Sequence, residues 1–312
     1  MHLLQIMGNK LNIGGQAVIE GVMIRSPNYA VVSVSKGKRI ITKKEKVRQR
    51  KGKFYKLPVV RGFYNLVDMM KIGMRSLMWS AEQQAGTKEE KISKAEMVCT
   101  VIFALGFAIL LFVAIPYLAT LFVGFKEETQ PFLFNLIDGL IRILIFLGYL
   151  AAISLLKDVK ILFQYHGAEH KAIHCYEKGK KLEINNIKKF SALHPRCGTA
   201  FIMIVLVVAI LTFSLITPII LGLFPSLATM HIVPRKIVLF LVRIGFIPLI
   251  AGLSYEFLKF SARYEKHPAM KVLIWPGLLM QKITTKEPDS RQMEVARTAV
   301  KNILKLEKQK DI

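Results

Sequence analysis

Three histidines recur at four-residue intervals in one short segment, at His166, His170 and His174. Residues four apart share one face of a helix, so the three imidazoles would project from it as a single stripe. His194 and Cys197 follow shortly before a long apolar segment. Imidazole and thiolate are common zinc ligands. This part of the chain, which holds four of the seven histidines, therefore predicts a divalent-metal site with zinc as the expected ion.

The length of the stripe limits how many of its histidines one ion can bind. A helix rises about 1.5 Å per residue, which places His166 and His174 about 12 Å apart along its axis. Zinc–ligand bonds are only about 2.0 to 2.3 Å long. The sequence therefore predicts that a single zinc takes one pair, either His166 with His170 or His170 with His174.

The first pair carries a further signal, because His166, Glu169 and His170 match the pattern H-x-x-E-H. This is the inverted form of a zinc-protease motif, in which the histidines bind zinc and the glutamate activates water. We therefore expect Glu169 to be the catalytic base. The remaining ligands are expected among three residues, which are His194, Cys197 and Glu256. The alternative is that these side chains form a hydrogen-bonded polar face and bind no metal.

The chain is both strongly apolar and strongly basic, with 53% hydrophobic residues and a net charge of +24. This combination is unlike that of an ordinary soluble domain. Four segments, 97–123, 133–156, 199–224 and 237–257, each offer about 20 mostly apolar residues, enough to cross ~30 Å of hydrocarbon. We therefore predict a mainly α polytopic membrane protein with four transmembrane helices in a lipid bilayer.

Positive charge is unevenly distributed around these segments. Residues 1–96 hold 19 Lys and Arg against 7 Asp and Glu, residues 157–198 hold 9 against 4, and residues 259–312 hold 12 against 6. The two connectors between paired spans carry far less charge. Basic loops stay on the cytoplasmic side of a membrane. The pattern predicts that both termini and the His/Cys-rich loop are cytoplasmic.

Short patterned segments flank the predicted spans. Residues 13–47 are typical of short β-strands joined by Gly-containing turns. Apolar residues at helical spacing predict amphipathic helices over 62–84 and 290–305, with Asp289 as the N-cap of the second. A shorter helix is expected over 184–193, ending before Pro195. The basic run 43–56 is expected to be a loop that faces solvent or anionic lipid headgroups rather than nucleic acid.

Six consecutive regions follow from these patterns. They are a cytoplasmic basic β unit (1–57), an amphipathic interfacial helix (58–96), transmembrane helices 1 and 2 (97–156), a cytoplasmic His/Cys-rich loop (157–198), transmembrane helices 3 and 4 (199–258) and a cytoplasmic tail with an amphipathic helix (259–312). Within the spans, Asp138 and Arg142 lie one turn apart, and Arg243 is expected at a similar depth. Because charges inside a bilayer are costly, we expect a buried ion-pair cluster that orders the bundle.

The chain resembles a known family at many of these residues and over most of its length. The resemblance is carried by residues 14–27, 60–62, 165–177, 194–199, 254–256 and 284–288. It is to the YqhQ-like family of bacterial membrane proteins, which are described as predicted metal-dependent enzymes. The resemblance implies a location in the bacterial cell (inner) membrane and a metal-dependent activity, and it names no substrate.

Two functions of different classes are consistent with the sequence. The leading hypothesis is a zinc-dependent hydrolase at the cytoplasmic membrane surface, with His166 and His170 as ligands and Glu169 as general base. The alternative is a non-enzymatic membrane-biogenesis factor that contacts the ribosome or the protein translocon through its basic regions, with the histidines in a structural role. A transporter is a third and less favoured hypothesis.

Overall fold

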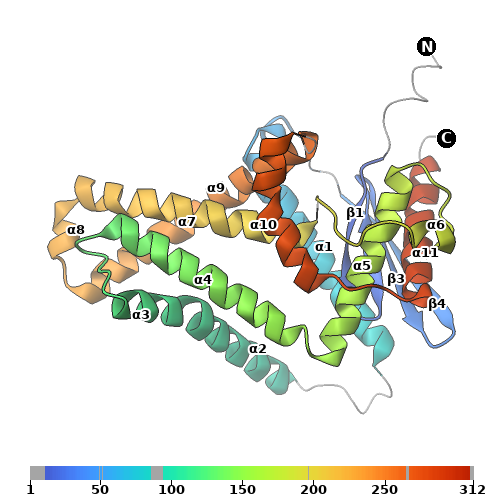
Figure 1. Ribbon diagram of the computed structural model, residues 1–312, viewed down its shortest axis with the longest axis horizontal. Coiled ribbons are helices and arrows are strands. Elements are labelled where there is room, and N and C mark those ends of the chain that lie inside the picture. Colours follow the sequence, from blue (N-terminus) through green and yellow to red (C-terminus); the bar gives the residue numbers. More distant parts are fainter. Residues whose placement is uncertain are drawn as a thin grey trace.

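The computed structural model describes residues 11–48, 50, 52–85, 94–195, 197–264 and 267–309. Figure 1 shows long helices extending from one side of a smaller unit, in which α5 and α11 lie beside a β-sheet. The helices are α1 (Val60–Gln84), α2 (Lys94–Ile109), α3 (Ile115–Phe122), α4 (Pro131–Ile153), α5 (Lys157–Glu177), α6 (Ile184–Ile187), α7 (Gly198–Leu223), α8 (Pro225–Thr229), α9 (Ile232–Arg263), α10 (Pro268–Thr284) and α11 (Ser290–Lys308). A 3₁₀ turn (Phe54–Lys56) precedes α1, and a π-helical turn (Leu110–Ala114) joins α2 to α3.

Within the described residues, four stretches of helix are long and apolar enough to cross a membrane. They are Ile102–Phe122, Pro131–Ile153, Gly198–Leu223 and Val233–Ser261. Large apolar side chains on them point away from the protein, such as Phe103 at 75% exposed and Leu144 at 68%. Such exposure is costly in water but not in lipid. The protein is therefore a membrane protein, and the predicted mainly α class with four spans is confirmed.

The charged residues of the spans are held in two hydrogen-bonded groups. Arg142 donates a hydrogen bond to Asp138 at 2.6 Å, as their spacing predicted. Arg243 donates to Glu127 at 3.1 Å and to Asn135 at 2.9 Å, which ties α9 to the α3–α4 connector and to α4. Each of these side chains thus has a partner of opposite charge or a polar group within the bundle, as apolar surroundings require.

The amino-terminal strands form a four-stranded antiparallel sheet in the order β1-β2-β3-β4. Their bounds are β1 (Gly14–Val18), β2 (Gly21–Arg25), β3 (Tyr29–Lys36) and β4 (Arg39–Lys46). Gly37 has a positive φ of 56° in the turn between β3 and β4, a conformation that glycine adopts at little cost. The predicted β unit is confirmed, with one correction. Residues 43–46 are not loop but strand, because they pair with β3 in the register Val32↔Lys43 to Tyr29↔Lys46.

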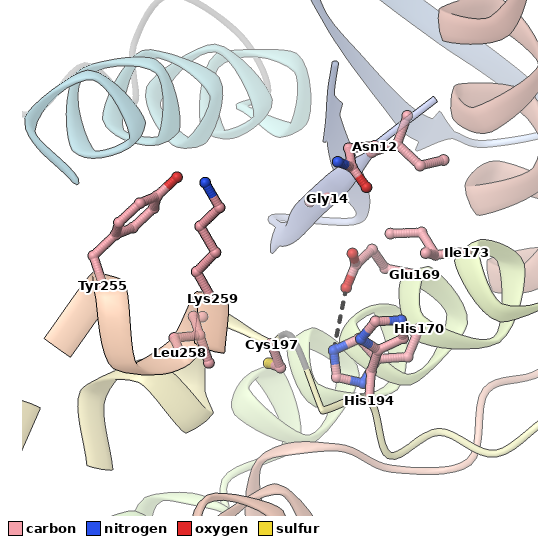
Figure 2. A pocket seen from close by; sticks show the side chains of 13 residues that line it. Asn12, Gly14, Glu169, His170, Ile173, His194, Cys197, Tyr255, Leu258 and Lys259 are labelled. Atoms are coloured by element: carbon pink, nitrogen blue, oxygen red, sulfur yellow. Dashed lines mark ion pairs between the residues drawn. The ribbon is translucent and has the colours of Figure 1, made fainter. Parts of the chain in front are cut away.

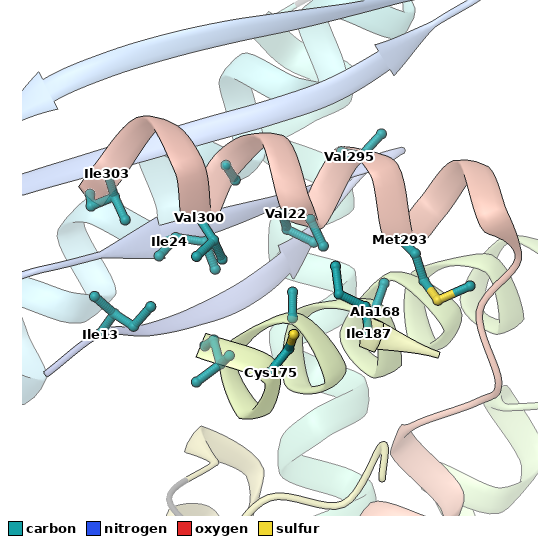
Figure 3. Close-up of a cluster of buried hydrophobic side chains, with 14 of the residues drawn as sticks. Ile13, Val22, Ile24, Ala168, Cys175, Ile187, Met293, Val295, Val300 and Ile303 are labelled. Carbon is teal, nitrogen blue, oxygen red and sulfur yellow. The ribbon is translucent and has the colours of Figure 1, made fainter. Parts of the chain in front are cut away.

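Helices cover both faces of this sheet. Successive side chains of a strand point to opposite faces, so Val22 and Ile24 belong to one core while Met23 belongs to the other. The first core, shown in Figure 3, packs β2 and β3 against α5 and α11. The second packs the opposite face against Ile72 of α1. The helix that carries the histidine stripe is therefore fixed between the sheet and α11 by its apolar side.

The helical boundaries agree with the sequence at some ends and differ at others. Asp289 caps α11 through a capping box with Gln292, as predicted. The helix expected over 184–193 ends at Ile187, since residues 188–195 form irregular backbone that contacts the histidines of α5. The helix that carries the histidines is separate from the second span, because the backbone at Leu156 is extended and α5 begins at Lys157.

Gly167 is the point where α5 meets the segment between α10 and α11. Lys286 donates its backbone N–H to Phe163 O at 2.9 Å, and a Cβ on Gly167 would collide with the carbonyl oxygen of Lys286.

We expect Gly167→Ala to destabilise the protein by about 1 to 3 kcal/mol, although alanine favours helix by about 1 kcal/mol. Thermal unfolding in detergent measures this change. The matched control is Gly148→Ala in α4, where a Cβ meets no atom within 4 Å. Equal stability of the two variants would contradict the expectation.

Candidate metal site

Helix α5 presents two different faces. Ala168, Ala172 and Cys175 point into the hydrophobic core, whereas the histidines point toward the chain that enters α7. Cys175 is fully buried, with its thiol directed at the backbone carbonyls of Lys180 and Lys181. It therefore contributes to packing and lies apart from the histidine clusters, which leaves Cys197 as the cysteine beside them.

His166, His170 and Cys197 form a compact buried cluster. Their potential ligand atoms all lie within 4.8 Å of one another. His166 Nε2 is 3.1 Å from Cys197 Sγ, and the His166 and His170 rings are 4.4 Å apart. Cys197 is also the N-cap of α7, where its sulfur accepts the backbone N–H of Thr199 at 3.3 Å. The sulfur thus lies at the amino end of α7, beside the first backbone N–H groups of the helix.

The three histidines of α5 share one hydrogen-bonding pattern through Nδ1. The acceptors for His166, His170 and His174 are the backbone carbonyl oxygens of Thr284, Ala192 and Ser191, at 2.8, 2.5 and 3.1 Å. A carbonyl can only accept, so each Nδ1 carries a proton, and in a neutral imidazole Nε2 then presents its lone pair. This is how histidine ligands are usually oriented in metal sites. Burial lowers the pKa of His170 and so favours the neutral imidazole, whereas its hydrogen bond with Cys197 raises the pKa.

Glu169 is a buried carboxylate beside this cluster. It is 3% exposed, and its Oε2 lies 3.5 Å from His170 Nε2. Within the described residues, Oε2 has no hydrogen-bond partner. Burial raises the pKa of Glu169, opposed by His166 and His194. β1 approaches the carboxylate at Gly15, where a Cβ would lie 2.9 Å from Oε1. A buried carboxylate oxygen without a hydrogen bond is costly, which makes Glu169 a candidate functional residue.

A second group lies one turn further along α5. The ligand atoms of His174, Glu177 and His194 also lie within 4.8 Å of one another. His194 Nε2 is 3.2 Å from Glu177 Oε2, and the His174 and His194 rings stack at 4.3 Å. Gln281 of α10 holds the backbone of His194 through both its N–H and its carbonyl, at 2.8 and 2.9 Å. The stripe is thus divided between two neighbouring groups, as the helical rise requires.

Glu256 is the one predicted ligand that lies in neither group. Its carboxylate receives two hydrogen bonds from the guanidinium of Arg61, one of them at 2.6 Å. The pair joins the start of α1 to α9, where Gly62 and Gly252 leave no room for a Cβ at the helix crossing. The sequence predicted that Glu256 lies at the same end of its span as the histidines. It could not show that Arg61, from a distant segment, forms an ion pair with it.

The first cluster opens into a pocket of about 520 Å³. Figure 2 shows Glu169 and His170 on one side and Tyr255 and Lys259 of α9 on the other, with Cys197 between them. Residues 12–15, which lead into β1, complete the wall. Sequence reasoning did not assign this strand, Tyr255 or Lys259 to the site. The Gly14-Gly15 pair was the available signal, because it allows close approach of a backbone.

A family described as "Protein of unknown function (DUF1385)" matches residues 57–306, which include every predicted ligand and Glu169. The chain is 29% identical over 309 residues to the uncharacterized protein YqhQ of Bacillus subtilis (strain 168), covering 94% of this chain and 92% of that protein. No solved structure matches the chain. The resemblance noted in the sequence motifs is confirmed, and the protein belongs to the DUF1385 family of YqhQ-like proteins.

Proposed function

We propose that this protein is a zinc-dependent hydrolase that works at the cytoplasmic face of the cell membrane. The observation that carries the proposal is the combination of three ligand atoms within 4.8 Å with a buried carboxylate beside them, whose Oε2 has no hydrogen bond among the described residues. His166, His170 and Cys197 would hold the metal, and Glu169 would be the general base. His170, Cys197 and Glu169 line one pocket, so a substrate in that pocket would reach both groups.

The donor set suits zinc among the common divalent ions. Two imidazole nitrogens and one thiolate favour zinc over magnesium or calcium, which prefer oxygen. Three protein ligands are the pattern of catalytic zinc sites, where a fourth position is open to water. Zinc bound there supplies Lewis acidity and a water of lowered pKa.

The remaining side chains of the pocket have roles that follow from their positions. Glu169 Oε2 is free to accept a proton, because the described residues offer it no hydrogen bond. Tyr255 and Lys259 face it from α9 and can donate hydrogen bonds to negative charge that develops on a substrate. Both residues lie near the end of the candidate span Val233–Ser261, which supports a reaction at the membrane surface.

Metal analysis of the purified full-length chain tests the proposal. Protein prepared in detergent without chelators should contain stoichiometric zinc by elemental mass spectrometry. It should also hydrolyse at least one member of a panel of chromogenic esters, amides and phosphodiesters, and a chelator should abolish that activity. Absence of stoichiometric metal in well-folded protein would rule out the hydrolase. Bound metal without any chelator-sensitive hydrolysis would leave a structural metal site in its place.

The alternative, a membrane-biogenesis factor that contacts the ribosome or the translocon, is favoured by one surface. β4 is an edge strand whose Arg39, Lys43, Lys44 and Lys46 are exposed. We expect that, if this surface binds ribosomal RNA, co-sedimentation with ribosomes weakens steeply as salt rises. The matched variant replaces Lys43 and Lys44 by Gln and should sediment less at low salt. No association of the wild type at the lowest salt would remove this alternative.

A further inference from the structure

A second pocket, of about 250 Å³, lies at the junction of the sheet, the segment after β4 and the start of α1. Four arginines line it, namely Arg25, Arg48, Arg50 and Arg61. Among the described lining residues, Asp68 is the acidic one. The pocket is separate from the histidine clusters, with which it shares no lining residue. Such a concentration of guanidinium groups in a small concave site is unfavourable without an anion.

Two of the four arginines are already paired. Arg50 donates two hydrogen bonds to Asp68, at 3.2 and 2.9 Å, and its guanidinium lies 4.5 Å from the centre of the Tyr64 ring. Arg61 is held by Glu256. These bonds fix the walls of the pocket and neutralise half of its positive charge. They also anchor α1 to α9 beside Tyr255, whose hydroxyl accepts a hydrogen bond from Asn65 at 3.1 Å.

Arg25 and Arg48 remain without such partners. Within the described residues, neither side chain has a hydrogen bond or an ion pair, and the Arg25 side chain is half-buried at the end of β2. Burial lowers the pKa of Arg25, and Asp68 and Tyr255 oppose that effect only from a distance. Buried cations in proteins are normally paired. The unpaired guanidinium of Arg25 therefore points to an anionic ligand.

We propose that this arginine pocket binds a phosphate group. Guanidinium groups bind phosphate oxygens in bidentate fashion, which Arg25 and Arg48 can provide because both line this pocket. The volume is below the ~300 to 1,000 Å³ typical of sites for drug-sized ligands, which suits a phosphate with a small substituent. The phosphate can come from an anionic lipid headgroup or from a soluble phosphate compound.

Helix α1 places the pocket at the level of a membrane surface. Met70, Met74 and Met78 form an apolar stripe on it, at 66%, 59% and 56% exposed. An exposed apolar stripe on an amphipathic helix is suited to lie in the lipid interface. Arg61 and Asn65 line the pocket from the first turns of the same helix. A lipid phosphate would therefore approach the arginines at the depth where headgroups are found.

The test uses full-length protein in nanodiscs of phosphatidylcholine, alone or mixed with phosphatidylglycerol. Thermal unfolding is followed in both, and in phosphatidylcholine nanodiscs with added inorganic phosphate. Stabilisation by phosphatidylglycerol alone identifies a lipid phosphate, and stabilisation by inorganic phosphate identifies a soluble source. Either result supports phosphate binding in the pocket, provided that Arg25→Gln lowers the apparent affinity for the stabilising probe by about tenfold or more. No stabilisation by either probe would overturn the proposal.

Two further variants separate a built site from general surface charge. Arg48→Gln changes an exposed side chain, so this variant should fold normally even if Arg25→Gln fails to fold. It should weaken the stabilisation by the phosphate probe. Arg39→Gln removes one exposed positive charge at the β3–β4 turn, away from the pocket, and should leave the response unchanged. An equal loss in Arg39→Gln and Arg48→Gln would show diffuse attraction to anions and would overturn the proposal.

Discussion

His170→Ala is expected to empty the metal site, reducing bound zinc from about one ion per chain to near zero. His170 is the central residue of the cluster, because its ring lies 4.4 Å from that of His166 and 5.6 Å from that of His194. A ligand removed from a three-residue set leaves two, which rarely retain zinc through purification. Elemental mass spectrometry measures the loss. Zinc added at about 1,000 times its dissociation constant should stabilise the wild type by about 4 kcal/mol and the variant by far less.

A matched control distinguishes loss of the site from loss of the fold. His231→Ala removes an exposed histidine at the start of α9, far along the chain from the cluster, and should retain the full metal content. His170→Ala also loses the hydrogen bond to Ala192 O, worth roughly 1 kcal/mol, so its melting temperature should fall modestly in metal-free buffer. A His170→Ala protein that keeps wild-type zinc would exclude the proposed ligand set.

Glu169→Gln should separate catalysis from metal binding. The amide has nearly the shape of the carboxylate but cannot act as a base, so hydrolysis should fall by about 10² to 10⁴-fold with zinc content unchanged. The melting temperature of the metal-free variant should rise, because a neutral amide replaces a buried carboxylate whose Oε2 lacks a hydrogen-bond partner among the described residues. Activity on the best substrate of the panel and thermal unfolding measure the two effects.

Glu183→Gln provides the corresponding control for Glu169→Gln. Glu183 is exposed just before α6 and lies outside both histidine groups. Its substitution changes the net charge by the same amount and should alter neither activity nor melting temperature. If Glu169→Gln lost its zinc as well, Glu169 would be a metal ligand rather than a base. If it retained both zinc and activity, another group would have to activate the water.

Local patterns account for the parts of the fold that the sequence predicted. The four spans follow from long apolar runs, the meander from short alternating strands with tight turns, and α11 from the cap at Asp289. These signals involve neighbours in the chain, where periodicity and capping act directly. The errors lie where tertiary contacts compete with local preference. Residues 188–195 are the example, because their carbonyls bind histidine rings of α5 in place of completing a helix.

The sequence by itself determined the ingredients of the site: a helix with histidines on one face, Glu169 among them, and the end of a predicted span nearby. Tertiary structure decided which groups meet. Cys197 reaches His166 from 31 residues away, Glu256 is engaged by Arg61, and β1 closes over Glu169 at Gly15. The reason is physical, since side-chain spacing on one helix fixes directions, whereas distances between elements depend on how their apolar faces pack.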